Sequence, residues 1–257
     1  MIETIVNRSI AVLPRYGATL WKLLAHPVAE VAPRSRAGDH VWDAVLFWSV
    51  SMAFFLLTRY IAFSPGADSM LYFTARGLSS ILQLLLVSMA FFLVWKLFGS
   101  RFRAGSFIIA TACIHGIILP LEAVLSLVSF GVARIIDFDL YRVMVNSVNG
   151  CGQIVSPDTL GNASRTGLDG PDGPKLNLIG LYILLTLPLI GVLIAYGIAY
   201  FRVLVQLAEG RKPFGRARVL LMLALGCLTA GLALSYTVVF DWTLFNDAAM
   251  CLPPQEG

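Results

Sequence analysis

Charged residues are scarce in this sequence. Asp, Glu, Lys and Arg make up 13% of its 257 residues, roughly half the share found in an ordinary soluble domain. Hydrophobic residues make up 58%. A chain of this length and composition is expected to be an integral membrane domain rather than a soluble fold with an anchor. Because Glu3 lies at the very start and no uninterrupted apolar core follows it, we do not expect a cleavable signal peptide.

Cysteine and histidine are also rare, with four and three residues respectively. Four cysteines without a C-x-x-C pair are too few for a disulfide-rich scaffold and do not indicate zinc or redox chemistry. We therefore expect no metal site and no cofactor. No nucleophile–base pair is evident, so the sequence does not indicate an enzyme. Basic residues are not interleaved with aromatics in a soluble module, so nucleic acid is not an expected partner.

Long apolar runs dominate the remainder of the chain. About 20 apolar residues suffice for a helix to cross a bilayer, and five segments meet this length with few or no charges. The sequence therefore predicts an all-α membrane bundle with five transmembrane helices, and Pro120 and Pro188 are expected to kink two of them. The predicted spans are 42–63, 77–95, 104–133, 176–201 and 219–240.

Residues 1–40 contain no apolar run long enough to span. Two amphipathic pieces are expected, one ending at Pro14 and one over residues 16–26, in which Leu20, Trp21 and Leu24 lie together. Such helices either lie in the membrane interface or pack on the protein itself. The stretch 27–40 is expected to be a polar linker.

Loop charges predict the orientation. Most of the 19 Lys and Arg residues fall in segment 1–40 and in the loops 96–103 and 202–218. By the positive-inside rule the N-terminus is cytoplasmic and the C-terminus lies outside. The long loop, 134–175, and the short tail, 242–257, are then expected on the outer side. We expect the membrane to be a bacterial inner membrane and the outer side to be the periplasm.

Two cysteines fall on the predicted outer side. Cys151 lies in the long loop and Cys251 in the tail, so the two could form a disulfide in an oxidising compartment. The sequence does not give the distance between them, and the pairing stays open.

The third span carries a line of polar side chains on one helical face. The spacing of three, four and seven residues keeps them in register. An ionisable group at membrane depth is costly unless it faces protein or water, so other spans should cover this face. His115 and Glu122 then serve either as a proton relay, cation site or head-group contact, or as interhelical hydrogen bonds that fix packing. The candidate residues are Thr111, His115, Glu122 and Ser126, followed by Ser129.

Two regions resemble the Yip family, the Ypt-interacting five-span proteins of the secretory pathway and their bacterial relatives. The sequence L-F-G-S-R-F-R-A-G-S-F at 97–107 is followed by H-G-I-I-L-P at 115–120, and L-W-K-L-L-A-H-P stands at 20–27. The family's acidic N-terminal motif is not apparent, so the resemblance does not extend to small-GTPase binding. It implies a non-enzymatic membrane protein that acts through partners or lipids.

Two functions remain open at this point. The first is a protein that binds or organises membrane lipids, another integral membrane protein or a second copy of itself. The alternative is a permease, or a permease subunit, that moves a small solute or ion along the polar face of the third span.

Overall fold

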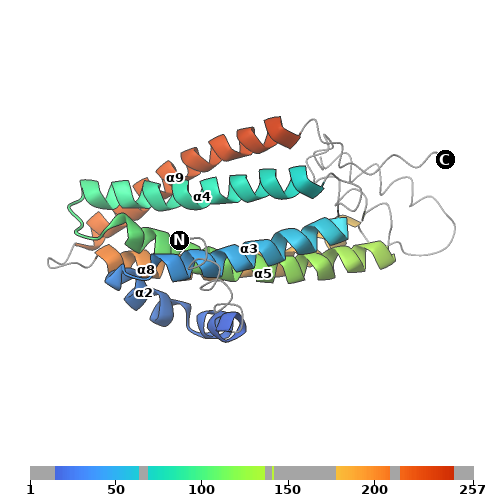
Figure 1. Ribbon diagram of the computed structural model, residues 1–257, viewed down its shortest axis with the longest axis horizontal. Helices are drawn as coiled ribbons and strands as arrows, with labels where there is room; N and C mark the ends of the chain where they lie inside the picture. Colours follow the sequence, from blue (N-terminus) through green and yellow to red (C-terminus); the bar gives the residue numbers. More distant parts are fainter. Residues whose placement is uncertain (1–14, 64–68, 137–140, 142–177, 209–214, 246–257) are drawn as a thin grey trace, which may run out of the picture.

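The computed structural model describes residues 15–63, 69–136, 141, 178–208 and 215–245, and these residues are helical except at short connections. A short N-terminal helix covers residues 15–25 and precedes the longer elements (Figure 1). Those elements are α2 (Pro27–Ala37), α3 (Val41–Phe63), α4 (Ser69–Leu97), α5 (Ala104–Ile136), α8 (Leu178–Ala208) and α9 (Arg216–Phe245).

The prediction of five spans is confirmed. Within the described ranges, five helices are long and apolar enough to cross a membrane, namely α3, α4, α5, α8 and α9. The helices extend beyond several predicted bounds, because α4 begins at Ser69 and α8 continues to Ala208. Arg202, expected in a loop, therefore lies inside α8, where a long side chain near a helix end can snorkel to the interface. The chain is a multi-pass membrane protein.

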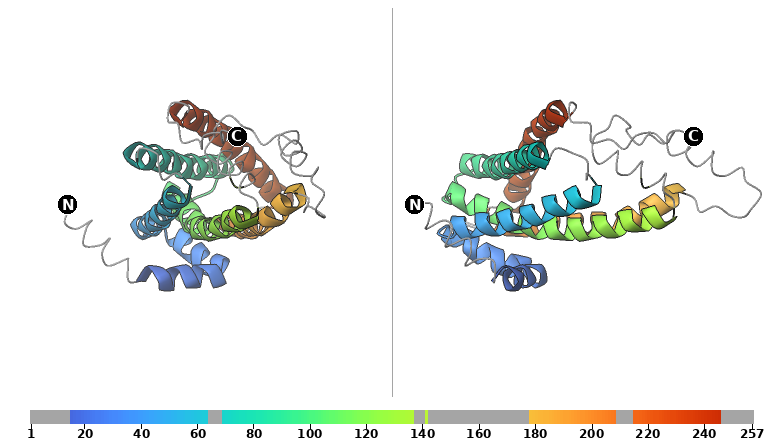
Figure 2. Two further views of the ribbon diagram at one scale, coloured as in Figure 1. Left: turned by 90° about the vertical axis from the view of Figure 1, so that its right-hand side faces the viewer. Right: turned by 45° about the vertical axis from the view of Figure 1, so that its right-hand side comes forward.

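Helix α5 lies at the centre of the bundle. In the 18-residue window that defines its candidate span, 61% of the residues are buried inside the protein, compared with 17% in the windows of α8 and α9. It contacts α2, α3, α4 and α8, whereas α9 packs mainly on α4. Figure 2 shows the α4–α9 pair on one side of α5 and the N-terminal helices on the other. The polar face of α5 is thus covered by protein, as its sequence requires.

Two glycines let helices approach closely. At Gly226 of α9 an added Cβ would lie 2.5 Å from two ring atoms of Phe91 on α4. At Gly116 of α5 it would lie 2.8 Å from a ring atom of Phe47 and 3.3 Å from the Cα of Trp48, both on α3. Small residues commonly allow such contacts between membrane helices.

The N-terminal helix packs against the bundle with one face. Leu23 is fully buried, and the hydroxyl of Tyr16 lies 2.8 Å from that of Ser51 on α3. Trp21 on the opposite face is 72% exposed. The helix thus packs on the protein itself, which is one of the two alternatives left open by its sequence. Its place in the membrane interface stays a prediction. The amphipathic piece before Pro14 lies outside the described residues.

The expectation of a polar linker at 27–40 is wrong, since most of it forms α2. Pro27 occupies the first turn, where its missing N–H costs no hydrogen bond, and Glu30 pairs with Arg34 one turn later at 2.8 Å. Val31 is completely buried. The helix ends at Gly38, whose φ of 71° is left-handed and whose N–H bonds to the carbonyl of Arg34. Tertiary burial outweighs the weak local helix signal.

The structure describes the two predicted kink prolines but not the two cysteines of the predicted disulfide. Pro120 is buried within α5 and Pro188 lies in α8, and both helices continue through the proline. The kinks themselves stay a prediction. Cys151 and Cys251 fall outside the described residues, so their pairing also stays a prediction.

Candidate functional site

The polar residues of α5 do not meet in one place. Thr111 faces α8, where its hydroxyl lies 2.9 Å from that of Tyr200 and also donates to the carbonyl of Phe107. Interhelical bonds of this kind contribute about 0.6 kcal/mol in membrane proteins. Ser126 is buried, with 6% of its surface exposed. Thr111 is therefore explained by packing between α5 and α8.

His115 is held by an aromatic side chain of α3. The indole Nε1–H of Trp48 donates to its Nδ1 at 3.1 Å. Indole is only a donor, so Nδ1 accepts and carries no proton. The imidazole is therefore the neutral tautomer with its proton on Nε2. This contact fixes the ring and makes its second nitrogen a hydrogen-bond donor.

Glu122 pairs with a cation from the first span. The guanidinium of Arg59 on α3 donates to its Oε1 at 2.9 Å, and the two side chains are 20% and 24% exposed. Arg59 also stacks over the ring of Phe55, 4.7 Å from its centroid. Charged groups inside a membrane protein typically pair in this way, because lone charges are costly at that depth. The pair links α3 to α5.

His115 and Glu122 both line a cleft between α3, α4 and α5, called here the polar cleft. Its volume is about 200 Å³. Two guanidinium groups line it, those of Arg59 and Arg76, and Glu122 is the one carboxylate among its described lining residues. Hydroxyl and amide groups of α4 complete the polar part. They belong to Ser79, Ser80 and Gln83.

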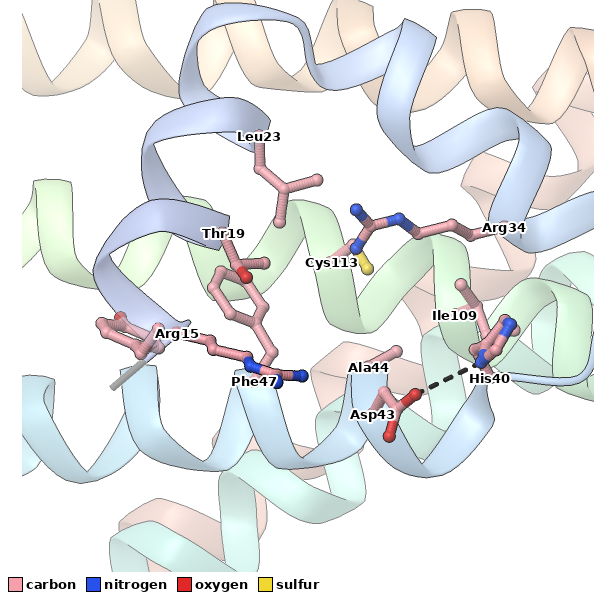
Figure 3. A pocket seen from close by; sticks show the side chains of 11 residues that line it. Arg15, Thr19, Leu23, Arg34, His40, Asp43, Ala44, Phe47, Ile109 and Cys113 are labelled. Atoms are coloured by element: carbon pink, nitrogen blue, oxygen red, sulfur yellow. Dashed lines mark hydrogen bonds and ion pairs between the residues drawn. The ribbon is translucent and has the colours of Figure 1, made fainter. Parts of the chain in front are cut away.

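A larger cavity lies beneath the N-terminal helix, at the end of the bundle where α3 and α5 begin. Its volume is about 470 Å³. Figure 3 shows Arg34 reaching from α2 toward Cys113 of α5, while Arg15 reaches along α3. The two cations give this cavity its name, the Arg15–Arg34 cavity. Its apolar lining is formed by Leu23, Ala44, Phe47, Ile109 and Cys113.

Polar contacts brace the walls of the Arg15–Arg34 cavity. Tyr16, whose ring also packs 5.3 Å from that of Phe47, shares a hydrogen bond with Ser51. Burial raises the pKa of Tyr16, and the bond to Ser51 opposes that shift only in part. His40 lies 3.2 Å from Asp43 at the start of α3. The N-terminal helix is therefore fixed to α3 as a wall of the cavity.

A packed layer separates the cavity from the polar cleft. Phe47 lines the first space and His115 the second. Between them Phe47 and Trp48 lie against Gly116 so closely that a Cβ there would collide with α3. The two spaces thus lie on opposite sides of one tight α3–α5 contact.

Metal ligation finds no support in the part of the chain described. No group of three or more His, Cys, Asp or Glu residues lies close enough there to hold an ion.

Comparison of the chain with protein-family models, with curated proteins and with solved structures finds no match. The resemblance to the Yip family therefore stays a prediction. The site must be interpreted from its own chemistry.

Sequence reasoning selected His115 and Glu122 but missed their partners. The pairing of Arg59 with Glu122 could have been predicted. An arginine inside an apolar span needs a counter-charge, and Glu122 is an acidic residue inside another apolar span. No comparable signal marked Trp48. Arg15 and Arg34 were counted only as topology signals, and nothing in the sequence indicated that they share a cavity.

Proposed function

We propose that the protein is a non-enzymatic membrane protein that binds an anionic membrane lipid, with the lipid head group in the Arg15–Arg34 cavity. This function agrees with the one that the resemblance to the Yip family implies. We favour a lipid over a protein partner as the ligand because the site is a cavity lined by cationic and apolar side chains. A protein partner would be expected to bind a flat apolar face instead.

The chemistry of the cavity is the observation that carries the proposal. Arginine guanidinium groups bind phosphate through paired, charge-assisted hydrogen bonds. Arg15 and Arg34 supply two such groups from different helices, and Arg34 also pairs with Glu30 at 2.8 Å. Asp43 is the carboxylate among the described lining residues, and it lies 3.2 Å from His40. Leu23 and Phe47 offer apolar surface to the first carbons of an acyl chain or glycerol. A space of about 470 Å³ is within the usual size of small-molecule sites.

The position of the N-terminal helix supports a lipid as the ligand. Its exposed Trp21 and buried Leu23 resemble the two faces of an interfacial helix, and tryptophan is enriched at head-group depth. We propose that this end is cytoplasmic and that the membrane is a bacterial inner membrane. Anionic lipids give the cytoplasmic leaflet a negative surface potential, which favours a basic cavity there.

The test is retention of lipid by purified protein. Wild type, Arg15→Gln and Arg34→Gln are purified in mild detergent, incubated with phosphatidylglycerol or phosphatidylcholine, and analysed by native mass spectrometry. We expect the wild type to retain phosphatidylglycerol and each variant to retain several-fold less. Arg101→Gln is the matched control, because Arg101 is exposed between α4 and α5 and does not line the cavity. Equal retention of the two lipids, or equal loss in the control, contradicts the proposal.

A permease is the second candidate, and the polar cleft is the observation that favours it. His115 and Glu122 line a cleft of about 200 Å³ between apolar spans, as a solute path requires. The packed layer at Gly116 closes that path toward the Arg15–Arg34 cavity, so transport requires α3 and α5 to separate. Solute flux in proteoliposomes that Glu122→Ala abolishes would establish it, and flux equal to that of empty vesicles would exclude it.

A further inference from the structure

We propose that the polar cleft between α3, α4 and α5 is a binding site for a small oxyanion, a carboxylate or a phosphate group. The site is distinct from the Arg15–Arg34 cavity and lies beyond the packed layer at Gly116. It does not depend on the lipid proposed for that cavity.

The charges of the lining favour an anion. Arg59 and Arg76 approach from α3 and α4, and Glu122 of α5 faces them. Glu122 accepts a hydrogen bond from Arg59 at 2.9 Å, and the described lining holds two guanidinium groups against this one carboxylate. Guanidinium groups from two helices offer the planar donor geometry that carboxylates and phosphates accept.

An unpartnered hydroxyl marks the interior of the cleft. Ser79 lines the cleft and is 2% exposed, and its Oγ has no hydrogen-bond partner among the described residues. A buried hydroxyl without a partner is unfavourable, and native structures nearly always satisfy such groups. An oxygen of a bound anion would accept a hydrogen bond from this hydroxyl. This observation is independent of the two arginines.

His115 adds a second neutral donor. Since Trp48 donates to its Nδ1 at 3.1 Å, the proton of the neutral ring is on Nε2, and the residue lines the cleft. A hydrogen-bond donor there suits an oxyanion and not a metal ion, which needs a nitrogen lone pair. Hydrogen-bond donors from α3, α4 and α5 thus all favour an oxyanion as the ligand.

The cleft has room for a small group. Its volume of about 200 Å³ is many times the roughly 15 Å³ that one water requires. Arg59 lies one helical turn before the end of α3 at Phe63, about 6 Å along the axis. The cleft therefore extends close to that end of α3, and its ligand is either a free solute or the head group of a lipid.

The experiment measures binding to the full chain in detergent by isothermal titration, with sodium phosphate and sodium succinate as free probes. Sodium chloride at matched ionic strength is the blank. Nanodiscs containing phosphatidylglycerol or phosphatidylcholine provide the lipid arm, read out by protein thermal stability. Saturable binding of a free probe identifies a solute site. A stability gain only with phosphatidylglycerol that Arg76→Gln reduces identifies a head-group site in the cleft.

Two lining variants and two controls assign the binding to the cleft. Arg76→Gln should raise the dissociation constant about tenfold or more, which is the change expected for loss of a charge-assisted hydrogen bond. Ser79→Ala removes only a hydroxyl, should fold normally, and should weaken binding several-fold. Arg134→Gln changes an exposed arginine near the end of α5 and should bind the free probes and the lipid as wild type does. Arg15→Gln alters the other cavity, so it should bind the free probes as wild type does, and only its response to phosphatidylglycerol should fall.

Three results would overturn the proposal. One is that neither free probe nor phosphatidylglycerol gives a signal above its blank. Another is that binding is unchanged in Arg76→Gln and in Ser79→Ala. The third is that Arg134→Gln weakens binding of any probe, or Arg15→Gln weakens binding of the free probes, as much as the lining variants do. Because Arg15→Gln affects only the cavity, a failure of the lipid proposal and a failure of this one give different patterns.

Discussion

Two glycines of α9 provide a matched test of how this helix packs. Gly226 and Gly231 both lie in the same span, and replacing either with alanine improves intrinsic helix propensity by about 0.5–1 kcal/mol. Nothing lies within 4 Å of a Cβ built on Gly231, whereas one built on Gly226 lies 2.5 Å from the Cδ1 and Cε1 atoms of Phe91. The propensity gain is common to both variants, so their difference isolates the collision.

The magnitude follows from the surroundings of Phe91. Ordinary carbon contacts are about 3.5–4.0 Å, so Gly226→Ala requires the ring to move by roughly 1 Å. Phe91 is 3% exposed and lies edge-on against Trp95 and Tyr200, with ring centroids 5.8 and 5.5 Å away. Overpacking of such a site costs about 1–3 kcal/mol. Gly226→Ala should therefore be less stable than Gly231→Ala by about that amount.

The assay is equilibrium unfolding in mixed micelles with increasing denaturing detergent, followed by helical circular dichroism. Gly231→Ala should unfold at or slightly above the wild-type midpoint, and Gly226→Ala clearly below that of Gly231→Ala. Shortening the obstructing ring with Phe91→Leu in the Gly226→Ala background should recover part of the loss. Indistinguishable midpoints for the two alanine variants would refute the close α4–α9 contact.

Two further outcomes are expected. A double-mutant cycle with Arg59→Met and Glu122→Gln should give a favourable coupling free energy of about 1–2 kcal/mol. Removing one partner of a fully buried ion pair costs about 3–5 kcal/mol, and the coupling here is smaller because the two side chains are 20% and 24% exposed. Additive effects of the two substitutions would contradict an ion pair in the membrane-embedded protein. Burial raises the pKa of Tyr16, so the folded protein favours the neutral phenol. The resulting contribution to stability is present below the ordinary tyrosine pKa of about 10. It is lost as the pH rises through the higher pKa that Tyr16 has in the folded protein. The difference between the phenolate absorbance titrations of wild type and Tyr16→Phe should then lie above pH 10, and a difference centred at or below it would contradict the buried hydroxyl.

The fold was largely predictable because its signal is a long uninterrupted run of apolar residues. Each span is defined by its own composition, independent of its neighbours. Helix α2 was missed because Pro27 and Pro33 favour an irregular segment. It forms because Val31 and its neighbours are buried against the bundle, and that burial depends on helices distant in sequence.

The candidate site was predictable only on one helix. Periodicity shows that His115 and Glu122 share a face of α5, but it does not show which span covers them. The pairing of Glu122 with Arg59 follows the rule that intramembrane charges meet, so it could have been inferred from the two apolar segments. The Trp48 contact and the Arg15–Arg34 cavity arise from tertiary placement alone.

The partnership of α4 with α9 has a consequence for biogenesis. Helix α3 meets its main partner α5 when the third span has been made, whereas α4 meets α9 only after the last span is complete. Until then α4 lacks the contact of Gly226 with Phe91, although Phe91 also packs on Tyr200 of α8 and Trp95 on Phe107 of α5. The final span is thus the one that completes the bundle, and a ribosome that stops before Gly226 leaves α4 without its main helix partner.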